Sequence, residues 1–427
     1  MENTINVADS ATKTHQPIVE QLKVLLNNNL ELKGALISSL MIASGMAKEK
    51  LNDQLYNGLN EVFNNNAWPT TIEDYYDYLD IYVKLVPNEE ISENYPDAWR
   101  SGPNQNGYNQ KVYDLLCQFY WLVDQNEPGS DVTIQSFPEF AEWLVAFANN
   151  WGEFCSTTDS FTEKSKASFK ANPMYNWDLY SGNEEKWDTF NKFFYREFNN
   201  AAEGTGISPL RPITDPTNNR TIVAPADCTY KKDYAIDANG SVLEDGKQAS
   251  VNLKHTHSIG SVTELLDGSQ YAEAFNGGTF VHYFLGPFDY HRFHTPVSGY
   301  VLESRKISGK VYLNVQIKPD GQWDAPDGAD NGYEFNQSRG LIILDTLELG
   351  KVAVLPIGMC QVSGVLMTPG LEGKEVVKGQ EFGKFQFGGS DIIMLFEKSP
   401  EELYMYKRDP GHNRIHFQYG QAAILAK

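Results

Sequence analysis

Three short stretches in the second half of the chain hold side chains that can perform acid–base and nucleophilic chemistry. APAD places Asp227 just after an extended run and a proline. PFDYHRFH places His291 and His294 three residues apart. In FGGSDIIMLFE, Ser390 follows two glycines and precedes an apolar run. An acid, a histidine and an accessible serine are the components of a triad that activates a hydroxyl for attack on a carbonyl.

The same residues also have ordinary structural explanations. An aspartate after a proline is common in turns, a histidine within an aromatic strand is common in a core, and Gly-Gly-Ser is common in a hairpin. An ordinary serine hydrolase is disfavoured, because no G-x-S-x-G motif is present and Ser390 precedes a strand, whereas a hydrolase serine opens a helix. A second explanation of the glycines is that the peptide bond before Ser390 must be accessible to chemistry.

The elements that must position these residues differ between the two halves of the chain. From residue 1 to about 200, apolar side chains recur at three- and four-residue spacing, most clearly in SFPEFAEWLVAFANNW. The ranges with the same pattern are 72–86, 108–125 and 184–198. From about residue 207, short β-branched and aromatic runs bounded by Gly, Pro, Asn and Asp predict strands.

These patterns predict an α+β fold with two domains. We expect a helical N-terminal domain over residues 1–200 and a β-rich catalytic domain over residues 201–427. The segment EGKEVVKGQEFGKFQFGG resembles the hairpins of barrel-sandwich modules, with KGQ as a tight turn between strands. We therefore expect the second domain to be similar to a barrel-sandwich.

Bulk composition restricts the class of protein. The chain has 427 residues and a formal net charge of −21, which disfavours nucleic acid and anionic membrane surfaces as partners. Its four cysteines are scattered without zinc-ligand spacing, as expected of reduced thiols in the cytoplasm. The N-terminus MENTINVADS lacks the features of a secretory signal, and the apolar run 34–47 is shorter than the roughly 20 residues of a membrane span. We therefore expect a soluble, cytoplasmic protein.

Several segments together resemble the phosphatidylserine decarboxylase family. They are PADC (225–228), GTFVHYFLGPFDYHRFHTPVSGYV (278–301), KGQEFGKFQFGGSDIIMLFE (378–397) and, before them, FNKFFYREF…SPLRPI. The resemblance covers roughly residues 185–400 in the family's order and spacing, and DYHRFH followed by a late Gly-Ser before an apolar strand is highly specific. The helical region resembles the extra domain of soluble relatives that decarboxylate free amino acids, the fungal tryptophan decarboxylases among them.

The family consists of self-processing, pyruvoyl-dependent enzymes, so the resemblance implies that the chain is cut between Gly389 and Ser390. In the family, the late serine attacks the carbonyl of the preceding glycine, and elimination and hydrolysis then leave a pyruvoyl group where the serine was. The products here are a long chain (1–389) and a short chain (390–427). Gly388 and Gly389 suit this attack, since glycine leaves the carbonyl uncrowded and adopts unusual dihedral angles.

The resemblance also implies a role for each polar residue. Carried across by position, His294 is the base that activates Ser390, and Asp227 orients that base. His291 matches the histidine assigned to decarboxylation. The substrate amine then forms a Schiff base with the pyruvoyl group made from Ser390, which accepts electrons as carbon dioxide leaves, as pyridoxal phosphate does elsewhere. No metal and no pyridoxal phosphate is expected.

The chain departs from the family at positions close to this site. Asp391 follows Ser390 where the family usually has Thr or Ser. A carboxylate beside the electron sink disfavours a carbanion, unless its side chain points to the opposite face of the strand. Phe288 stands where an arginine is usual, and Cys228 stands where a glycine is usual.

The expected substrate follows from the charge balance and from Phe288. Loss of a cation there suits a substrate without a phosphate, which favours decarboxylation of a free L-amino acid to its amine. The resemblance to the tryptophan decarboxylases implies that this amino acid is aromatic. The alternative is phosphatidylserine, with phosphatidylethanolamine as the product. We therefore expect Phe288, Asp391 and, less strongly, His257 to contribute to substrate binding.

Other interpretations remain open from the sequence. KHTHS places His255 and His257 on one side of an extended segment, but no third ligand stands at chelating spacing, so no metal site is predicted. A lipoyl or biotinyl carrier is disfavoured, because neither DKA nor MKM occurs. The rival hypothesis is a non-catalytic binding relative that stays unprocessed because of Asp391. Family analogy also suggests a homodimer.

Overall fold

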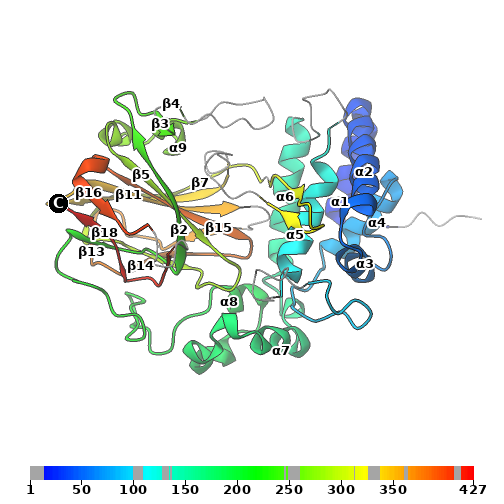
Figure 1. Ribbon diagram of the computed structural model, residues 1–427, viewed down its shortest axis with the longest axis horizontal. Coiled ribbons are helices and arrows are strands. Elements are labelled where there is room, and N and C mark those ends of the chain that lie inside the picture. Colours follow the sequence, from blue (N-terminus) through cyan, green and yellow to red (C-terminus); the bar gives the residue numbers. More distant parts are fainter. Residues whose placement is uncertain are drawn as a thin grey trace, which may run out of the picture.

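The computed structural model describes residues 14–99, 109–126, 134, 137–244, 247–248, 260–311, 313–325, 337–359, 364–407 and 415–427. Helices occupy the N-terminal half of the described chain, and strands occupy the C-terminal half (Figure 1). The helices of the first half are α1 (Pro17–Asn28), α2 (Leu30–Lys50), α3 (Asp53–Val62), α4 (Ile72–Tyr82), α5 (Lys111–Val123), α6 (Pro138–Phe154), α7 (Glu163–Ala171) and α8 (Phe190–Phe194).

Short polar side chains begin many of these helices by accepting a hydrogen bond from a backbone N–H of the first turn. These capping residues are Asn29, Asn52, Thr71, Thr162 and Thr189. The helices predicted over 72–86 and 108–125 are confirmed as α4 and α5. The helix predicted over 184–198 is wrong, since only α8 is α-helical there. Trp187 packs edge-on against Trp177 at 5.1 Å and lies in non-helical backbone, so a new helix starts after Thr189.

The strands begin at residue 221, and all the pairings between the named strands are antiparallel. They are β1 (Thr221–Val223), β2 (Cys228–Ile236), β3 (Val242–Glu244), β4 (Lys247–Gln248), β5 (Thr279–Leu285), β6 (Arg292–His294), β7 (Gly299–Ile307), β8 (Gln316–Ile317), β9 (Trp323–Asp324), β10 (Arg339–Thr346), β11 (Gly350–Met359), β12 (Val365–Met367), β13 (Glu375–Val376), β14 (Glu381–Phe385), β15 (Gly389–Phe396), β16 (Leu403–Met405), β17 (His416–Phe417) and β18 (Ala422–Ala426). A short helix, α9 (Val262–Leu265), lies between β4 and β5.

The largest sheet has the order β13-β7-β10-β11-β15-β5-β2-β3-β4, with β17 paired to β2. Two small sheets, β1-β18-β16 and β12-β14-β6, complete the β-rich part. Strand β15 therefore lies at the centre of the large sheet, between β11 and β5. Residues 390–396 of β15 are buried, which accounts for the apolar run from Ile392 to Phe396.

Two separate apolar clusters cover the two faces of this sheet. Alternate residues of β15 belong to different clusters: Ile392 and Met394 to the larger, Ile393 and Leu395 to the smaller. The smaller cluster is closed by α9, through Val262 and its neighbours. The larger cluster continues into the helical part of the protein, so the two parts share one core.

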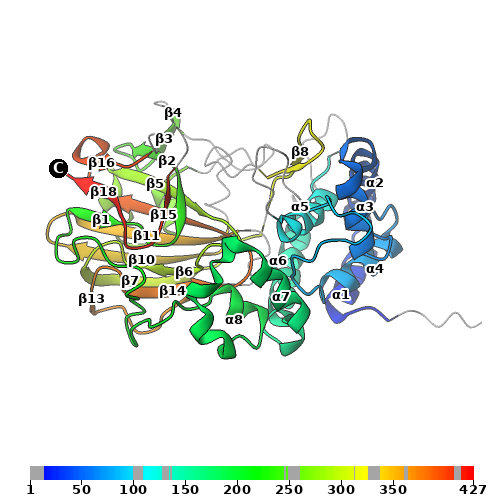
Figure 2. The same ribbon diagram turned by 60° about the horizontal axis from the view of Figure 1, so that its bottom comes forward.

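Aromatic side chains make the junction between the two parts. Phe387, just before β15, contacts the rings of Trp151 in α6 at 5.2 Å and of Phe190 and Phe194 in α8 at 4.9 and 5.2 Å. Its backbone N–H also donates to Asn191 Oδ1 at 2.9 Å. Figures 1 and 2 both show α8 lying between the strands and the other helices. The segment before Ser390 is thus fixed by packing against helices.

The predicted α+β fold class is confirmed. The barrel-sandwich detail is not, because the strands in the described part of the chain form open sheets and no closed barrel. KGQ does form a tight turn, in which the N–H of Gln380 donates to the carbonyl of Val377 at 3.0 Å. The strands that it joins, β13 and β14, belong to different sheets, so the expected hairpin is not present.

The apolar run 34–47 lies within α2, which is longer than the run itself. With 21 residues, α2 is long and apolar enough to cross a membrane by length and composition alone. The same test is passed by core helices of soluble proteins, and α2 packs against α5, where Trp121 Nε1 donates to the carbonyl of Ala43 at 2.9 Å.

Replacing Phe387 by Ala should destabilise the protein by about 3–5 kcal/mol, because it leaves a cavity where four aromatic rings meet. We would measure unfolding by denaturant in the Ser390→Ala background, so that one chain is present in every sample. Leu347→Ala is the matched control, since Leu347 is fully exposed and its loss should cost less than about 0.5 kcal/mol. Equal effects of the two substitutions would contradict the shared core.

Candidate active site

Ser390 lies at the start of the central strand β15. Its backbone pairs with Gly358 of β11 and Leu285 of β5, and its side chain is fully buried. Within the described residues, its Oγ has no hydrogen-bond partner. Gly388 has a φ of +149°, a conformation that residues with a Cβ rarely adopt. The unusual dihedral expected before the serine is therefore present at Gly388, and the hydroxyl is not held by another side chain.

Asp391 points away from Ser390, as the strand alternation predicts. Its Oδ2 lies 3.1 Å from Nε2 of His282, and both side chains are fully buried. His282 stands opposite Ile393 in the pairing of β5 with β15, on the face of the smaller apolar cluster. A buried carboxylate needs such a partner, because an uncompensated charge in an apolar core is strongly destabilising. The negative charge of Asp391 is thus placed on the opposite side of the sheet from the hydroxyl of Ser390.

His294, at the end of β6, is held as a neutral ring with a defined tautomer. Its Nδ1 donates to the carbonyl of Gly379 at 2.7 Å, which leaves Nε2 as an acceptor for the hydroxyl of Tyr290 at 3.1 Å. The ring of Tyr419 stacks on it at 4.0 Å. Burial lowers the pKa of His294 to about 3, so the ring is neutral at physiological pH. Nε2 therefore carries a lone pair that can accept a proton.

The turn that holds His294 is rigid. Gly379 has a φ of +84°, and a Cβ at this position would lie 2.4 Å from Cδ1 of Ile213, so only glycine fits. Its N–H donates to the carbonyl of Thr295 at 2.8 Å. Next to it, the ammonium of Lys378 donates to three backbone carbonyls at 2.6–2.7 Å. Those carbonyls belong to Asp215, Asn218 and Thr221.

Asp227 lies close to His294 but does not hydrogen-bond to it. Its carboxylate accepts from Arg211 Nη2 at 3.0 Å and from the backbone N–H of Tyr419 at 2.8 Å. The same Tyr419 stacks on His294, so Asp227 positions the ring through Tyr419. The negative charge of Asp227 also raises the pKa of His294, against the larger effect of burial.

His291 is covered by an aromatic ring from α8. Its ring is fully buried and stacks on that of Phe194, with centroids 3.8 Å apart. Burial, and then the charge of Arg196, hold the pKa of His291 well below its usual value. Phe194 also contacts Phe387, which precedes the Gly-Gly-Ser turn. The side chain of His291 and the segment leading to Ser390 thus meet the same phenylalanine.

Two other residues that were predicted to bind substrate are Phe288 and His257. Phe288 is partly buried, its carbonyl accepts from Arg196 Nη2 at 2.7 Å, and its ring folds back over Gly286. His257 lies outside the described residues. Predictions from the sequence missed the contact of His416, a largely exposed side chain that bonds through Nε2 to Asp289 Oδ1 at 2.8 Å. They also missed Tyr290, although it lies within DYHRFH, and Tyr419, for which the sequence carries no local signal.

One group of described side chains has the geometry to hold a metal ion. The ligand atoms of His15, Asp77 and Asp80 lie within 4.8 Å of one another in the helical part. Asp80 accepts from the His15 ring and from the backbone N–H of Gln16, both at 2.8 Å. These bonds join the start of α1 to α4, which gives the group a structural role without an ion.

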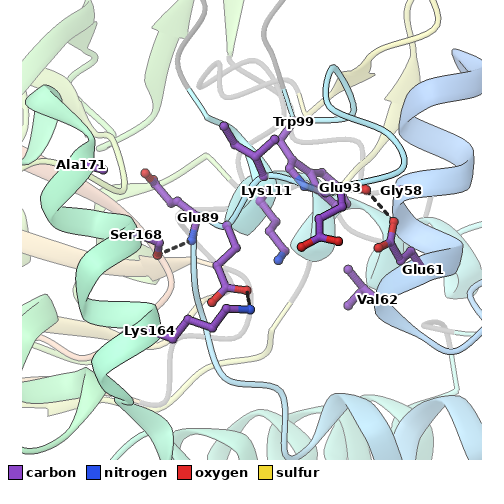
Figure 3. Close-up of a pocket in the computed structure, with 13 residues that line it drawn as sticks. Gly58, Glu61, Val62, Glu89, Glu93, Trp99, Lys111, Lys164, Ser168 and Ala171 are labelled. Carbon is purple, nitrogen blue, oxygen red and sulfur yellow. Dashed lines mark hydrogen bonds and ion pairs between the residues drawn. The ribbon is translucent and has the colours of Figure 1, made fainter.

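One cavity lies wholly within the helical part and has a volume of about 620 Å³ (Figure 3). Lys164 forms an ion pair with Glu90 at 2.7 Å, and Glu89 accepts from Asn172 and Tyr175. Burial raises the pKa of Glu89 to about 7. None of the described residues that line this cavity belongs to the set predicted for catalysis, so it is separate from the site around Ser390.

Comparison with known proteins identifies relatives of the strand-rich part. The family model described as phosphatidylserine decarboxylase matches residues 190–424. The phosphatidylserine decarboxylase proenzyme of Clostridium perfringens is 32% identical over 266 residues, which cover 62% of this chain and 79% of the relative. That of Clostridium novyi is 30% identical over 253 residues, which cover 59% and 75%. Phosphatidylserine decarboxylase proenzyme 3 of Schizosaccharomyces pombe is 33% identical over 210 residues, but the match covers only 19% of that longer relative.

The buried pair of His282 and Asp391 should behave as one unit in stability measurements. His282→Leu removes the imidazole beside the buried carboxylate of Asp391, and we expect a loss of about 3–5 kcal/mol of unfolding free energy, as is typical when one partner of a buried polar pair is removed. The double variant His282→Leu/Asp391→Val should lose much less than the sum of the single losses, because both polar groups are then gone. Chemical denaturation of all four chains measures this coupling, and additive losses would contradict the pair.

Proposed function

Because the chain belongs to the phosphatidylserine decarboxylase family, a family of pyruvoyl-dependent carboxy-lyases, we propose that it cuts itself between Gly389 and Ser390 and then decarboxylates phosphatidylserine. The observation that carries the proposal lies within the matched region: the hydroxyl of Ser390 is buried, has no hydrogen-bond partner among the described residues, and stands two positions after Gly388. The proposed catalytic domain spans residues 201–427.

The self-processing step balances with the groups present. Ser390 Oγ attacks the carbonyl carbon of Gly389, and the peptide C–N bond breaks as an ester forms and the serine amine becomes free. Loss of the Ser390 α-proton then breaks the Cβ–Oγ bond and releases the carboxylate of Gly389. Addition of water and loss of ammonia convert the remaining group to a pyruvoyl group at position 390.

His294 is the proposed base for the first proton transfer. Its neutral ring has Nδ1–H bound to Gly379, so Nε2 is the atom that accepts the proton of Ser390. For this role, Nε2 must exchange the hydroxyl of Tyr290 for that of Ser390. Asp227 acts as a positioning residue through Tyr419, and its charge favours the protonated ring that forms.

A pyruvoyl group supplies an electrophilic carbonyl that draws electrons from the α-carbon of a bound amine. The residues around position 390 suit such a group, since a buried apolar face excludes water and Asp391 is directed to the other face, towards His282. His291 is the proposed proton donor or acceptor for the substrate, held under Phe194. Turnover by an enzyme with Asp391 is therefore compatible with the observed side-chain directions.

The choice of substrate reverses the expectation from the sequence. The relatives are named for phosphatidylserine, and none of those described above is named for an amino acid, so the comparisons support the phospholipid better. A free amino acid stays a second candidate on one observation. His291 and Ser390 are fully buried. Aromatic rings of α6 and α8 pack over His291 and over Phe387, which lies just before Ser390. A small amino acid would enter such a site more easily than a phospholipid would.

Processing is tested by the intact mass of the denatured protein. We expect the native sequence to give two chains, 1–389 and 390–427, with a short chain whose carbonyl reacts with hydroxylamine. Ser390→Ala is the matched control and should give one full-length chain. A single full-length species from the native sequence would overturn the proposal and favour a non-catalytic binding relative.

Substrate choice is tested on the processed protein by release of carbon dioxide. Phosphatidylserine in mixed micelles should be decarboxylated, while tryptophan, phenylalanine and tyrosine should give rates at least tenfold lower at matched concentration. Ser390→Ala provides the blank for each substrate. Faster release from a free amino acid would reject the phospholipid and establish the second candidate.

A further inference from the structure

A second cavity, of about 390 Å³, lies where the segment around α8 meets the small sheet of β6 and β14. Its lining is rich in cations. The residues are Asn183, Lys186, Trp187, Asp188, Lys192, Tyr195, Arg196, Glu197, Arg292 and Lys384. We call it the Arg196 pocket. Five basic side chains face two carboxylates there, although the chain as a whole carries a net charge of −21.

Some of these cations are neutralised within the protein. Arg292 bonds to Glu381 at 2.7 Å and to Glu197 at 2.8 Å. Lys192 pairs with Asp188 at 2.8 Å. Lys186 also lies 3.7 Å from Glu197, so Arg196 and Lys384 are the lining cations that form no ion pair within the described residues.

Arg196 is the most deeply buried of the remaining cations, with only 2% of its surface exposed. Its guanidinium bonds to backbone carbonyls, those of Phe288 at 2.7 Å and Asp289 at 3.3 Å, and lies 4.5 Å from the ring of Tyr180. Its Nε has no hydrogen-bond partner among the described residues, and none of their carboxylates forms an ion pair with it. A buried cation that is bonded only to neutral oxygens attracts an anion strongly, because the anion neutralises its charge.

Lys384 is the second such cation. Its ammonium lies 4.3 Å from the centre of the Tyr195 ring, and no ion pair joins it to a carboxylate in the described part of the chain. Burial, and then the nearby charge of Arg292, hold its pKa below the usual value. A bound anion would offset both effects, because it stabilises the charged ammonium.

The pocket is connected to the site around Ser390 through backbone contacts. The carbonyls that bind Arg196 belong to the turn that leads to His291, and Phe194, two residues before Arg196, stacks on His291. Arg292 follows His291 directly in β6. An anion in the pocket therefore lies against the same short segments that position His291.

We propose that the Arg196 pocket binds a phosphate group, either the phosphodiester of a phospholipid headgroup or free inorganic phosphate. Phosphate oxygens accept hydrogen bonds from a guanidinium N–H and attract an ammonium as a point charge, and these are the groups that Nε of Arg196 and Nζ of Lys384 offer. The headgroup source rests on the proposed function, since it requires a phosphate-bearing substrate. The pocket itself does not depend on processing of the chain.

The test measures binding to full-length Ser390→Ala, which is neither cut nor active. Isothermal titration with inorganic phosphate and with glycerophosphoserine should show binding of both, and free serine should not bind. Lys384→Gln should weaken phosphate binding by about tenfold or more, as expected for loss of a charged hydrogen-bond donor. Lys398→Gln is the matched control, because Lys398 lies outside the pocket and pairs with Glu402 on the surface; it should leave binding unchanged.

The outcomes separate the sources and the two proposals. Binding of both ligands, with competition between them, supports the headgroup as the source, and binding of inorganic phosphate alone supports free phosphate. Binding of neither ligand, or equal affinity in Lys384→Gln and Lys398→Gln, overturns the pocket. The intact mass of the native sequence tests processing separately. An uncut protein that binds phosphate would therefore reject the proposed function and still support the phosphate-binding pocket.

Discussion

The alternation of side chains along β15 is the constraint on which the site depends. Because this strand is buried on both faces, neighbouring residues enter different cores. Ser390 therefore faces the larger cluster, which includes the helices, while Asp391 faces the smaller cluster and His282. A shift of one residue in the register would exchange the two and place a carboxylate where the hydroxyl now lies. Two long flanking strands hold this register without a bulge.

The helical part is a structural component of this site as well as a neighbour of it. Phe194 covers His291. Phe387, just before Ser390, packs against aromatic rings of both α6 and α8. Asn191 of α8 accepts the backbone N–H of Phe387, so a hydrogen bond and three ring contacts fix one residue. The large sheet positions the hydroxyl of Ser390, and the helices cover the imidazole of His291. Each half of the chain would leave the site incomplete without the other.

The sequence predicts the groups that lie in short motifs, and it misses the contacts that join distant segments. Ser390, His291 and His294 could be selected because glycine pairs and histidine spacing are local. Tyr419 stacks on His294 from 125 residues away, and no local pattern distinguishes it from any other tyrosine. The helix predicted over 184–198 failed for a related reason, since the packing of Trp187 against Trp177 outweighs the helical spacing of its apolar residues. The direction of Asp391 was predictable, because strand alternation is a local rule, but its partner His282 was not.

Burial of His294 has a consequence for the rate of proton transfer. A base whose pKa is lowered to about 3 holds a proton weakly, and general bases act best when their pKa lies near the working pH. A reaction that each chain undergoes once tolerates a weak base, whereas repeated turnover does not. The low pKa therefore fits His294 better to the proposed self-processing than to the proposed turnover. The nearby negative charge of Asp227 raises the pKa of His294 and so recovers part of the basicity that burial removes.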